Sequence, residues 1–392
     1  MAQGLLRAGI PVRVFERDAT AWDRPQGYRL HLEADALNAL REVLTPALHE
    51  LFLATAMRTE PFTTILSTGL EVVKRLPTGD GHDESKWPGW GGDAPVHANV
   101  DRATLRELLL DGLAEAVEFG REVTGFDSNE SGVTVHFSDG TSAEGDILVG
   151  ADGIRSTVRG QLAPHLQTMD AGVQAIYGKV PWSAAMEVAP DAVLEDIFAI
   201  GMDDRKVFLG LGAVEFPTTP LAAAAAAGRD GLLTERENYV VCIVGGRHRY
   251  FPAPHDDLRR RPAPELQQIA LDVIEDWPAP ARAVIAAADP ESFFSVGMYA
   301  SVPGGLDAPV NVTLLGDAVH AMTPTLGRGA NLAMRDGALL SRAIRSVAEG
   351  ALTIPAALAE YEAEMIQYSG EVVRESVRVG EQRMAQDPLP EV

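Results

Sequence analysis

Two segments of the sequence place glycine and aspartate directly after an apolar run, where a folded chain can hold a ligand. Residues 150–153 read Gly-Ala-Asp-Gly, and residues 316–318 read Gly-Asp-Ala. A helix is predicted soon after each segment, in the second case from a glycine-rich stretch, residues 327–331. Glycine lets a bound group approach the backbone closely, and free N–H groups at a helix start favour anionic or electron-rich ligands. Together the segments predict one ligand site on a doubly wound sheet, although either alone could be a capped tight turn.

Glu16 is a further candidate, because it ends a short apolar run, residues 10–16, that is predicted to be a buried strand. In a dinucleotide-binding βαβ unit, an acid at the end of the second strand hydrogen-bonds ribose hydroxyls about 20 residues after a Gly-x-Gly-x-x-Gly loop. That spacing puts the glycine loop and the first strand before Met1. The alternative interpretation of Glu16 is a solvent-exposed strand end.

Other chemistries find little support in the sequence. The only cysteine, Cys242, lies in an apolar run and is predicted to be a buried thiol, which excludes an internal disulfide and a thiol-rich metal site. The histidines, among them His97, His248 and His255, show no metal-ligand spacing, so no metal is predicted. His320 follows the second glycine turn; it could relay protons there, but a packed structural histidine is the favoured interpretation.

The composition is that of a globular protein with an acidic surface. Its 392 residues carry a formal net charge of −23, with 46% apolar and 23% charged residues. So strong a negative charge argues against nucleic acid or an anionic membrane as the main partner. No apolar stretch is long enough to span a bilayer and no signal-peptide pattern opens the sequence, so a cytoplasmic location is expected.

The order of predicted elements indicates an α/β domain that a β-rich domain interrupts. A helix over residues 1–8 precedes the strand at 10–16, and Gly9 between them is suited to a helix end. From about residue 169 the pattern changes to successive apolar, strand-like runs, so the middle of the chain is predicted to form an antiparallel sheet before the first domain resumes. The expected domains are 1–168, 169–301 and 302–392. Further predicted elements are helices at 35–44, 102–116, 264–277, 329–349 and 355–383, a short helix or loop at 221–228, and strands at 122–126, 133–137, 146–149, 175–180, 193–200, 206–214, 239–244, 293–300 and 310–315.

Taken in order, these motifs resemble those of the class A FAD-dependent monooxygenases, the aromatic hydroxylase family that includes para-hydroxybenzoate hydroxylase. Residues 150–159 resemble the Asp-Gly motif of that family, and residues 316–331 resemble its second flavin-binding motif. Arg102 matches an arginine that opens a helix beside the cofactor, and Gly27 leads a run that matches the family's glycine-led strand. The resemblance implies an α/β fold, with a Rossmann-like FAD-binding domain, an interrupting β-rich substrate domain and C-terminal helices.

The resemblance also implies which residues hold the cofactors FAD and NAD(P)H. Glu16 would bind the adenosine ribose, Arg102 the phosphate or ribityl region, and Asp317 the ribityl and pyrophosphate part. Residues 327–331 would lie against the isoalloxazine ring, and the motif at 150–159 is associated with both FAD and NAD(P)H. The full set that the resemblance assigns to cofactor binding is Glu16, Gly27, Arg102, Asp152, Arg159, Gly316, Asp317, Pro324, Gly327, Gly329, Ala330 and Asn331.

For function, the resemblance implies that NAD(P)H reduces FAD and that O₂ then forms a flavin C4a-hydroperoxide. This species would insert one oxygen atom into an aromatic or polyketide-like small molecule between the middle sheet and the flavin, so no protein residue is assigned as the catalyst. Trp87 and Trp90 could line the substrate entrance or pack as ordinary loop residues. Two alternatives stay open: a non-redox cyclase or isomerase, and a scaffold protein that has lost flavin turnover.

The expected position of the glycine loop before Met1 has two explanations. Either the coding sequence begins upstream of the position taken as its start, which is an easy error in a GC-rich gene, or the loop has been lost and FAD binds weakly. The first is favoured, because Met1 would otherwise begin within a predicted helix. The sequence assigns no oligomeric state.

Overall fold

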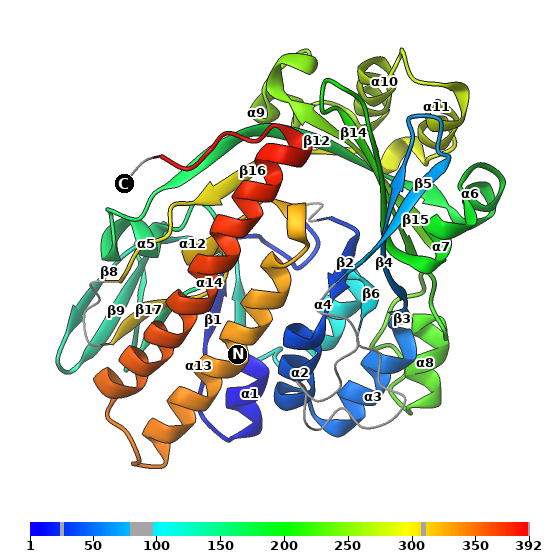
Figure 1. Ribbon diagram of the computed structural model, residues 1–392. Helices are drawn as coiled ribbons and strands as arrows, with labels where there is room; N and C mark the ends of the chain where they lie inside the picture. Colours follow the sequence, from blue (N-terminus) through cyan, green and yellow to red (C-terminus); the bar gives the residue numbers. More distant parts are fainter. Residues whose placement is uncertain (24–26, 79–96, 307–310, 391–392) are drawn as a thin grey trace.

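The computed structural model describes residues 1–23, 27–78, 97–306 and 311–390, which fold into an α/β architecture (Figure 1). One part combines short parallel strand pairs with two long helices, and the other is a seven-stranded sheet with helices on one face. The long helices, α13 (Gly329–Ala348) and α14 (Ile354–Met384), contact each other side by side. The expected fold class, an α/β domain interrupted by a β-rich one, is confirmed. Trp87 and Trp90 lie outside the described residues.

Two parallel strand pairs carry the predicted motifs. Strand β1 (Val14–Glu16) pairs with β7 (Val117–Phe119), and β11 (Leu148–Gly150) pairs with β17 (Val312–Leu314). Because β11 and β17 are parallel, the turns that follow them leave the same edge of the pair. The two glycine-aspartate segments are thereby brought to one end of the fold.

Two small antiparallel sheets and several helices complete this part of the molecule. One sheet has the strand order β2-β6-β3, and the other has the order β10-β9-β8. Their strands are β2 (Arg29–Leu32), β3 (Met57–Arg58), β6 (Ala98–Asp101), β8 (Val123–Asn129), β9 (Gly132–Phe137) and β10 (Ser142–Gly145). The helices here are α1 (Ala2–Arg7), α2 (Ala34–Val43), α3 (Pro46–Thr55), α4 (Arg102–Leu110), α5 (Thr157–Leu162) and α12 (Asp317–His320).

The seven-stranded sheet has the strand order β16-β12-β15-β14-β13-β4-β5. Five of its strands come from the predicted middle domain: β12 (Thr168–Pro181), β13 (Asp196–Met202), β14 (Phe208–Val214), β15 (Tyr239–Arg247) and β16 (Phe294–Ser301). Strands β4 (Glu60–Leu66) and β5 (Val72–Pro77) come from the preceding part of the chain, and β4 pairs with β13 in parallel. The sheet is thus antiparallel except at this one junction, where a distant segment has been added.

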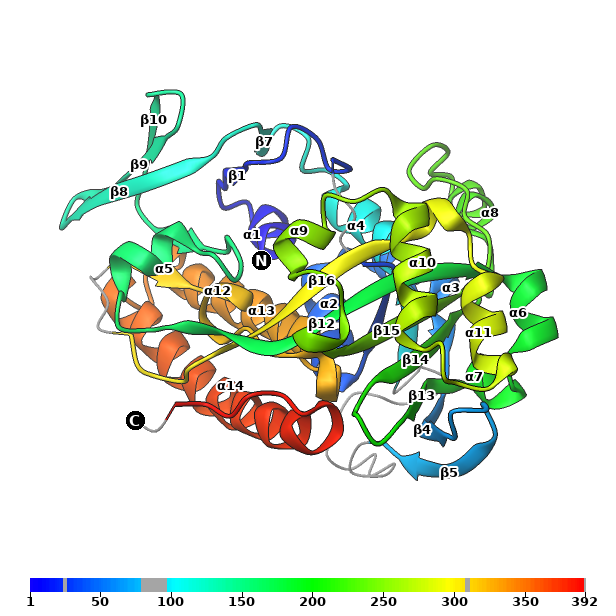
Figure 2. The ribbon, with the colours of Figure 1, turned by 90° about the horizontal axis from the view of Figure 1, so that it is seen from above.

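The two faces of this sheet differ in what covers them. Helices α6 (Trp182–Val188), α7 (Asp191–Glu195), α10 (Ala263–Val273) and α11 (Ala279–Ala286) cover one face, as Figure 2 shows for α6, α10 and α11 beside β12 and β15. On that side Cys242 is fully buried, as predicted. On the other face Tyr177, Ile243 and Ile200 are only half-buried, and their register places them in one row across β12, β15 and β13. This apolar row therefore lies on the face of the sheet that α6, α7, α10 and α11 do not cover.

Several boundaries differ from the sequence prediction for local physical reasons. Helix α4 ends at Leu110 instead of Ala116, because Gly112 takes a left-handed φ of 71° and the chain turns toward β7. Strand β1 begins at Val14, and Pro11, which has no N–H to donate to a ladder, precedes it. The predicted helix at 264–277 ends at Val273. The predicted strand at 193–200 begins as helix α7, and residues 221–228 are mostly helical, in α8 (Pro220–Ala226).

Candidate cofactor site

Asp317 is the residue from which the candidate site is built. It starts helix α12 directly after β17, where Gly316 adopts a φ of 61°. The Asp317 side chain is exposed, and no side-chain hydrogen bond joins it to any of the described residues. Burial by surrounding groups nevertheless raises its pKa, and the charges of His320 and Arg102 oppose that rise. A carboxylate with free acceptor capacity and close neighbours is suited to bind hydroxyl or N–H groups of a ligand.

A buried acid–imidazole pair supports the loop under Asp317. Asp336 Oδ2 accepts the Gly316 N–H at 2.8 Å and lies 2.6 Å from His320 Nε2. The other oxygen of Asp336 accepts the hydroxyl of Tyr368. Burial is the largest single effect and disfavours the imidazolium form of His320, but the hydrogen bond to Asp336 and the charges of Asp336 and Asp317 together outweigh it and raise the pKa of His320. This geometry agrees with the favoured sequence interpretation of His320 as a packed structural residue.

The turn at 324–331 lies beside Asp317. A 3-10 helix (Pro324–Leu326) leads to Gly327, which has a left-handed φ of 68°, and α13 starts at Gly329. A Cβ placed on Gly329 would be 4.0 Å from Asp317 Oδ1, so the start of α13 and the carboxylate face the same space. The side chain of Asn331 is fully buried and fixes the turn, because its Nδ2 donates to the carbonyls of His31 and Gly327 at 3.0 and 2.9 Å.

Arg102 approaches the same space from helix α4. Its backbone N–H donates to the carbonyl of Tyr28 at 2.8 Å, and Asp101 caps the helix by accepting the N–H of Thr104 at 2.7 Å. A Cβ on Gly27 would lie 3.5 Å from Arg102 Nη1, so the guanidinium passes close to this glycine. Arg102 also lowers the pKa of Asp317 electrostatically, which indicates that the two charges are near each other. Gly27, Arg102, Asp317 and the α13 start therefore converge.

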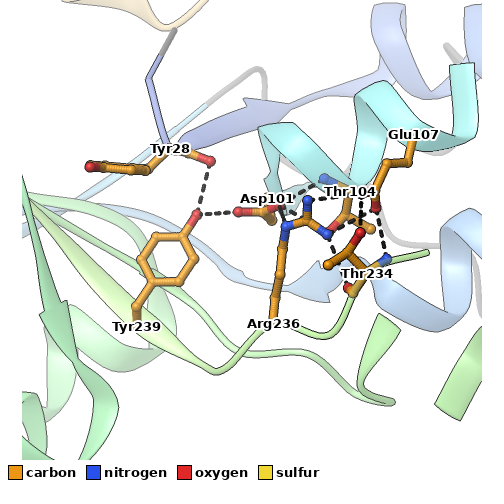
Figure 3. Close-up of polar contacts among 7 residues, drawn as sticks. All are labelled: Tyr28, Asp101, Thr104, Glu107, Thr234, Arg236 and Tyr239. Carbon is orange, nitrogen blue, oxygen red and sulfur yellow. Dashed lines mark hydrogen bonds and ion pairs between the residues drawn. The ribbon is translucent and has the colours of Figure 1, made fainter. Parts of the chain in front are cut away.

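A buried polar network holds the cap of α4 against the seven-stranded sheet (Figure 3). The Tyr239 hydroxyl contacts the Tyr28 carbonyl at 2.8 Å and Asp101 Oδ2 at 2.9 Å. Arg236 Nε lies 3.2 Å from Asp101 Oδ1, and its Nη1 lies 2.9 Å from Glu107 Oε2 (Figure 3). The segment that leads into β15 thus fixes the position of the helix that begins with Arg102.

Strand β2 contributes two polar side chains that the sequence analysis did not assign. Arg29 and His31 lie two residues apart and so project from the same face of the strand. A Cβ on Gly327 would be 3.7 Å from His31 Nδ1, and His31 Nε2 is hydrogen-bonded to His97 Nδ1 at 3.1 Å. Burial, with the charges of Arg29 and His97, lowers the pKa of His31 well below its usual value, so the imidazole is neutral. The sequence signal that could have identified Arg29 and His31 was the alternation of polar and apolar residues in the run after Gly27.

Three of the predicted residues are engaged elsewhere in the structure. Glu16 ends β1 as expected, and its Oε1 accepts the N–H of Asp18 at 3.1 Å. Both oxygens of Asp152 cap helix α5, one accepting the Ser156 hydroxyl and the other the Thr157 N–H at 2.7 Å. Arg159 donates to the backbone carbonyls of residues 154 and 318 at 2.7 and 2.8 Å. Their contact with a cofactor stays a prediction.

The donor set fits the chemical groups of FAD. Asp317 offers carboxylate oxygens for ribityl hydroxyls, Arg102 offers a cation for phosphate, and the start of α13 offers free N–H groups with a positive dipole. No group of three or more His, Cys, Asp or Glu side chains in the described part of the chain could hold a metal ion. No described helix combines the length and apolarity needed to cross a membrane.

Comparison with known proteins agrees with this geometry. The model of a family described as "FAD binding domain" matches residues 1–376. The chain belongs to this family. The resemblance to the class A FAD-dependent monooxygenases is thereby confirmed, over more of the chain than the sequence motifs alone cover.

The similar proteins include monooxygenases and hydroxylases. The chain is 33% identical over 373 residues to the dual O-methyltransferase/FAD-dependent monooxygenase elcB of Phaeosphaeria nodorum, covering 89% of this chain and 39% of that protein. It is 30% identical over 271 residues to the FAD-dependent urate hydroxylase of Klebsiella pneumoniae, covering 68% of this chain and 59% of the hydroxylase. The chain thus spans about two fifths of the length of the dual enzyme.

A solved structure gives the same fold. The crystal structure of Klebsiella pneumoniae HpxO with FAD and uric acid superposes with a TM-score of 0.73 at 22% identity, covering 98% of this chain and 86% of that one. The α/β fold of this FAD-binding family is therefore the fold of this chain.

Proposed function

We propose that this protein is an FAD-dependent monooxygenase that uses NAD(P)H and O₂ to insert one oxygen atom into an aromatic or polyketide-like small molecule. One observation carries the proposal: the unpaired Asp317 carboxylate, the Arg102 guanidinium and the start of α13 converge on one space. These groups match the hydroxyl, phosphate and ring portions of FAD. The FAD-dependent monooxygenases and hydroxylases among the similar proteins support the same reaction class. A cytoplasmic location, where NAD(P)H is available, is part of the proposal.

The chain's own residues would bind and orient the cofactor. Asp317 would accept hydrogen bonds from ribityl hydroxyls, and Arg102 would neutralise phosphate charge. The free N–H groups of residues 329–331 and the positive end of α13 would stabilise negative charge at the ring edge. Bound FAD supplies the redox and oxygen-transfer chemistry, so the protein needs no nucleophile or catalytic triad.

The substrate is proposed to lie against the face of the seven-stranded sheet that α6, α7, α10 and α11 do not cover. There Tyr177, Ile243 and Ile200 form a half-buried apolar row, and Tyr177 stacks on Phe294 with ring centroids 5.4 Å apart. Gly210 lies between Ile243 and Ile200 in the register, and the ring of Phe198 fills the space where a side chain at position 210 would lie, so the row is apolar at its centre too. An apolar surface suits a planar ring, and it keeps water away from the reacting atoms.

The test is flavin occupancy followed by coupled turnover. The purified protein is incubated with FAD, freed of excess flavin, and assayed for visible absorbance and released flavin; NAD(P)H oxidation and O₂ uptake are then measured with phenols, hydroxybenzoates and purines. Substrate-dependent consumption of both co-substrates with a hydroxylated product supports the proposal. Bound flavin without O₂ uptake for any substrate would favour the non-redox alternative, and absence of flavin binding would favour the scaffold.

A further inference from the structure

We infer that the protein has a second ligand site, which binds a small aliphatic carboxylate in a pocket separate from the cofactor and substrate sites. The pocket has a volume of about 220 Å³ and lies between the end of β16, the loop at 303–305, helix α12 and the middle of helix α14. The described residues that line it include none of those assigned to FAD or to the apolar row on the sheet. The inference therefore goes beyond the proposed function and does not depend on it.

The walls of this pocket are fixed by contacts within the fold. Strand β16, helix α12 and helix α14 contact one another in pairs, and each supplies part of the lining. The loop is tied down at both ends, because the Val302 N–H donates to the Gln167 carbonyl at 2.8 Å and His165 Nε2 lies 3.0 Å from the Gly305 carbonyl oxygen. Since a cavity of about 150 Å³ holds benzene, the pocket has room for a molecule of that size or slightly larger.

Two buried side chains of the lining have polar atoms without partners. Ser301 and His320 are each 2% exposed, and neither Ser301 Oγ nor His320 Nδ1 has a well-formed hydrogen bond to a described residue. Because His320 Nε2 is bonded to Asp336 and the pKa of His320 is raised, the imidazolium form, in which Nδ1 also carries a proton, is favoured. The N–H groups of Gly304 and Gly305 likewise bond to no described backbone carbonyl. A ligand with acceptor oxygens would satisfy these donors.

The charge of the lining favours an anion. Arg374 lines the pocket from α14, and a Cβ on Gly370 would lie 3.5 Å from its Nη1, so the guanidinium folds back over this glycine. Within the described part of the chain no carboxylate pairs with Arg374, and the adjacent Glu375 is bonded to Arg378 instead. The described lining contains no Asp or Glu, although the chain carries a net charge of −23. The pocket is thus a locally cationic place on an acidic protein, where an anion is attracted.

The remaining lining selects the body of the ligand. Val319, Ile366 and Val373 give the pocket aliphatic walls, and no Phe, Tyr or Trp among the described residues lines it, so nothing there stacks on an aromatic ring. A phosphate or another fully polar anion would leave oxygens against these apolar walls, which is costly. The arrangement therefore suits one carboxylate on a short, branched aliphatic chain. Helix α12 carries Asp317 at its first residue and His320 at its last, so this ligand would lie one helical turn from the cofactor site without entering it.

The experiment compares two probes of nearly equal shape, 4-methylpentanoate and its uncharged amide 4-methylpentanamide. Each is titrated into the protein with FAD added, at neutral pH, and binding is followed by calorimetry while the visible absorbance reports bound FAD. We expect the acid to bind about tenfold more tightly than the amide, because hydrogen bonds to a charged acceptor are the stronger ones. The FAD absorbance should not change. Release of FAD by the acid would show competition at the cofactor site and would overturn the inference.

Variants locate the bound acid. Arg374→Gln, at an exposed residue, should reduce the affinity for the acid to that for the amide, and Arg378→Gln, an exposed control one turn later on α14, should keep the full preference. Gly370→Leu should abolish binding of both probes by filling the pocket; the nearest atoms to a Cβ there are 3.5 and 3.7 Å away, so the position accepts a side chain. If Gly370→Leu does not fold, Arg374→Gln decides. Equal binding of acid and amide, no binding of either, or an unchanged preference in Arg374→Gln overturns the inference.

The outcomes also separate this inference from the proposed reaction. The titrations require neither NAD(P)H nor O₂, so a preference for the acid that depends on Arg374 supports the second site even if no turnover is found. Conversely, if oxygen insertion is demonstrated but the acid does not bind, the proposed function stands and the second site is overturned.

Discussion

The hydroxyl of Tyr239 lies 2.8 Å from the carbonyl oxygen of Tyr28, the same oxygen that accepts the N–H of Arg102 at 2.8 Å. A residue of the seven-stranded sheet and the first residue of helix α4 thus share one acceptor. Because Tyr239 is fully buried, no water can replace its hydroxyl without a rearrangement. The position of Arg102 is therefore coupled to the sheet that is proposed to hold the substrate.

Tyr239→Phe should weaken both folding and cofactor binding. The change removes the hydroxyl's contacts with Tyr28 and Asp101 and leaves a buried carboxylate oxygen under-bonded, which should cost about 1–3 kcal/mol of unfolding free energy. FAD affinity should also fall, because the α4 cap loosens. Urea denaturation and FAD titration test this. Tyr299→Phe, at a half-buried tyrosine, serves as the control and should change stability by about 0.5 kcal/mol or less.

Arg236→Met should be strongly destabilising. Arg236 is the cation between Asp101 and Glu107, whose side chains are 4% and 9% exposed. Removing it leaves two carboxylates without the arginine that pairs with both, and breaking such a buried ion pair costs about 3–5 kcal/mol. The measurement is the midpoint of urea unfolding, with Arg249→Met as the matched exposed control. An effect no larger than that of the control would show that the network does not stabilise the fold.

Asp317→Asn should separate cofactor binding from stability. The pKa of Asp317 is raised by burial, so its contribution to stability is largest below its ordinary value of 3.8 and is lost as pH rises through the folded-state pKa. At neutral pH the FAD-free variant should therefore be at least as stable as the wild type. FAD affinity should fall about tenfold to hundredfold, because hydrogen bonds to a charged acceptor are lost.

Two aspartates provide contrasting controls for that experiment. Asp230→Asn, at an exposed position, should change neither quantity. Asp152→Asn should lower stability by about 1 kcal/mol, because the Asp152 carboxylate caps helix α5. If Asp317→Asn instead destabilised the FAD-free protein like Asp152→Asn and left FAD affinity intact, Asp317 would be structural.

His320 should make stability fall in alkaline solution. Its folded-state pKa is raised above the ordinary 6.5, because the hydrogen bond to Asp336 and the charges of Asp336 and Asp317 together outweigh burial, which opposes the charged form. The corresponding stabilisation is fully present below pH 6.5 and is lost as pH rises through the folded-state pKa. Unfolding free energies measured from pH 6 upward, as a working range, should decline in the wild type and vary less in His320→Asn. An equal decline in both proteins would assign the pH dependence to other groups.

The sequence predicted the site best where backbone geometry dictates residue type. Gly316 and Gly327 take left-handed φ values of 61° and 68°, and Asp317 follows a buried strand, so these positions could be recognised from local pattern alone. The same reasoning located the start of α13 and the end of α1 at Gly9. Such features can be recognised in the sequence because they depend only on residues a few positions apart.

Contacts between distant segments could not be predicted in this way. Arg29 meets Ile197 and Gly212 only after the chain has folded, and no local pattern distinguishes it from a solvated strand arginine. An aspartate at position 152 has the same sequence signature whether its carboxylate caps a helix or binds a cofactor. In the structure it caps helix α5. Likewise, the short β4 carries no sequence signal that it joins the sheet of the later segment.

The pairing of β4 with β13 limits which segments can be excised or exchanged between proteins. Strand β4 adds to β13 from more than a hundred residues earlier in the chain, and β5 follows it at the sheet edge. Excising residues 169–301 would strip β13 of its neighbour and leave an unpaired, aggregation-prone edge. Chimaeras that exchange specificity with a relative must therefore carry residues 60–77 together with the later strands. For the same reason, the sheet is completed only once a long loop has closed, so its assembly is expected to be a slow step of folding.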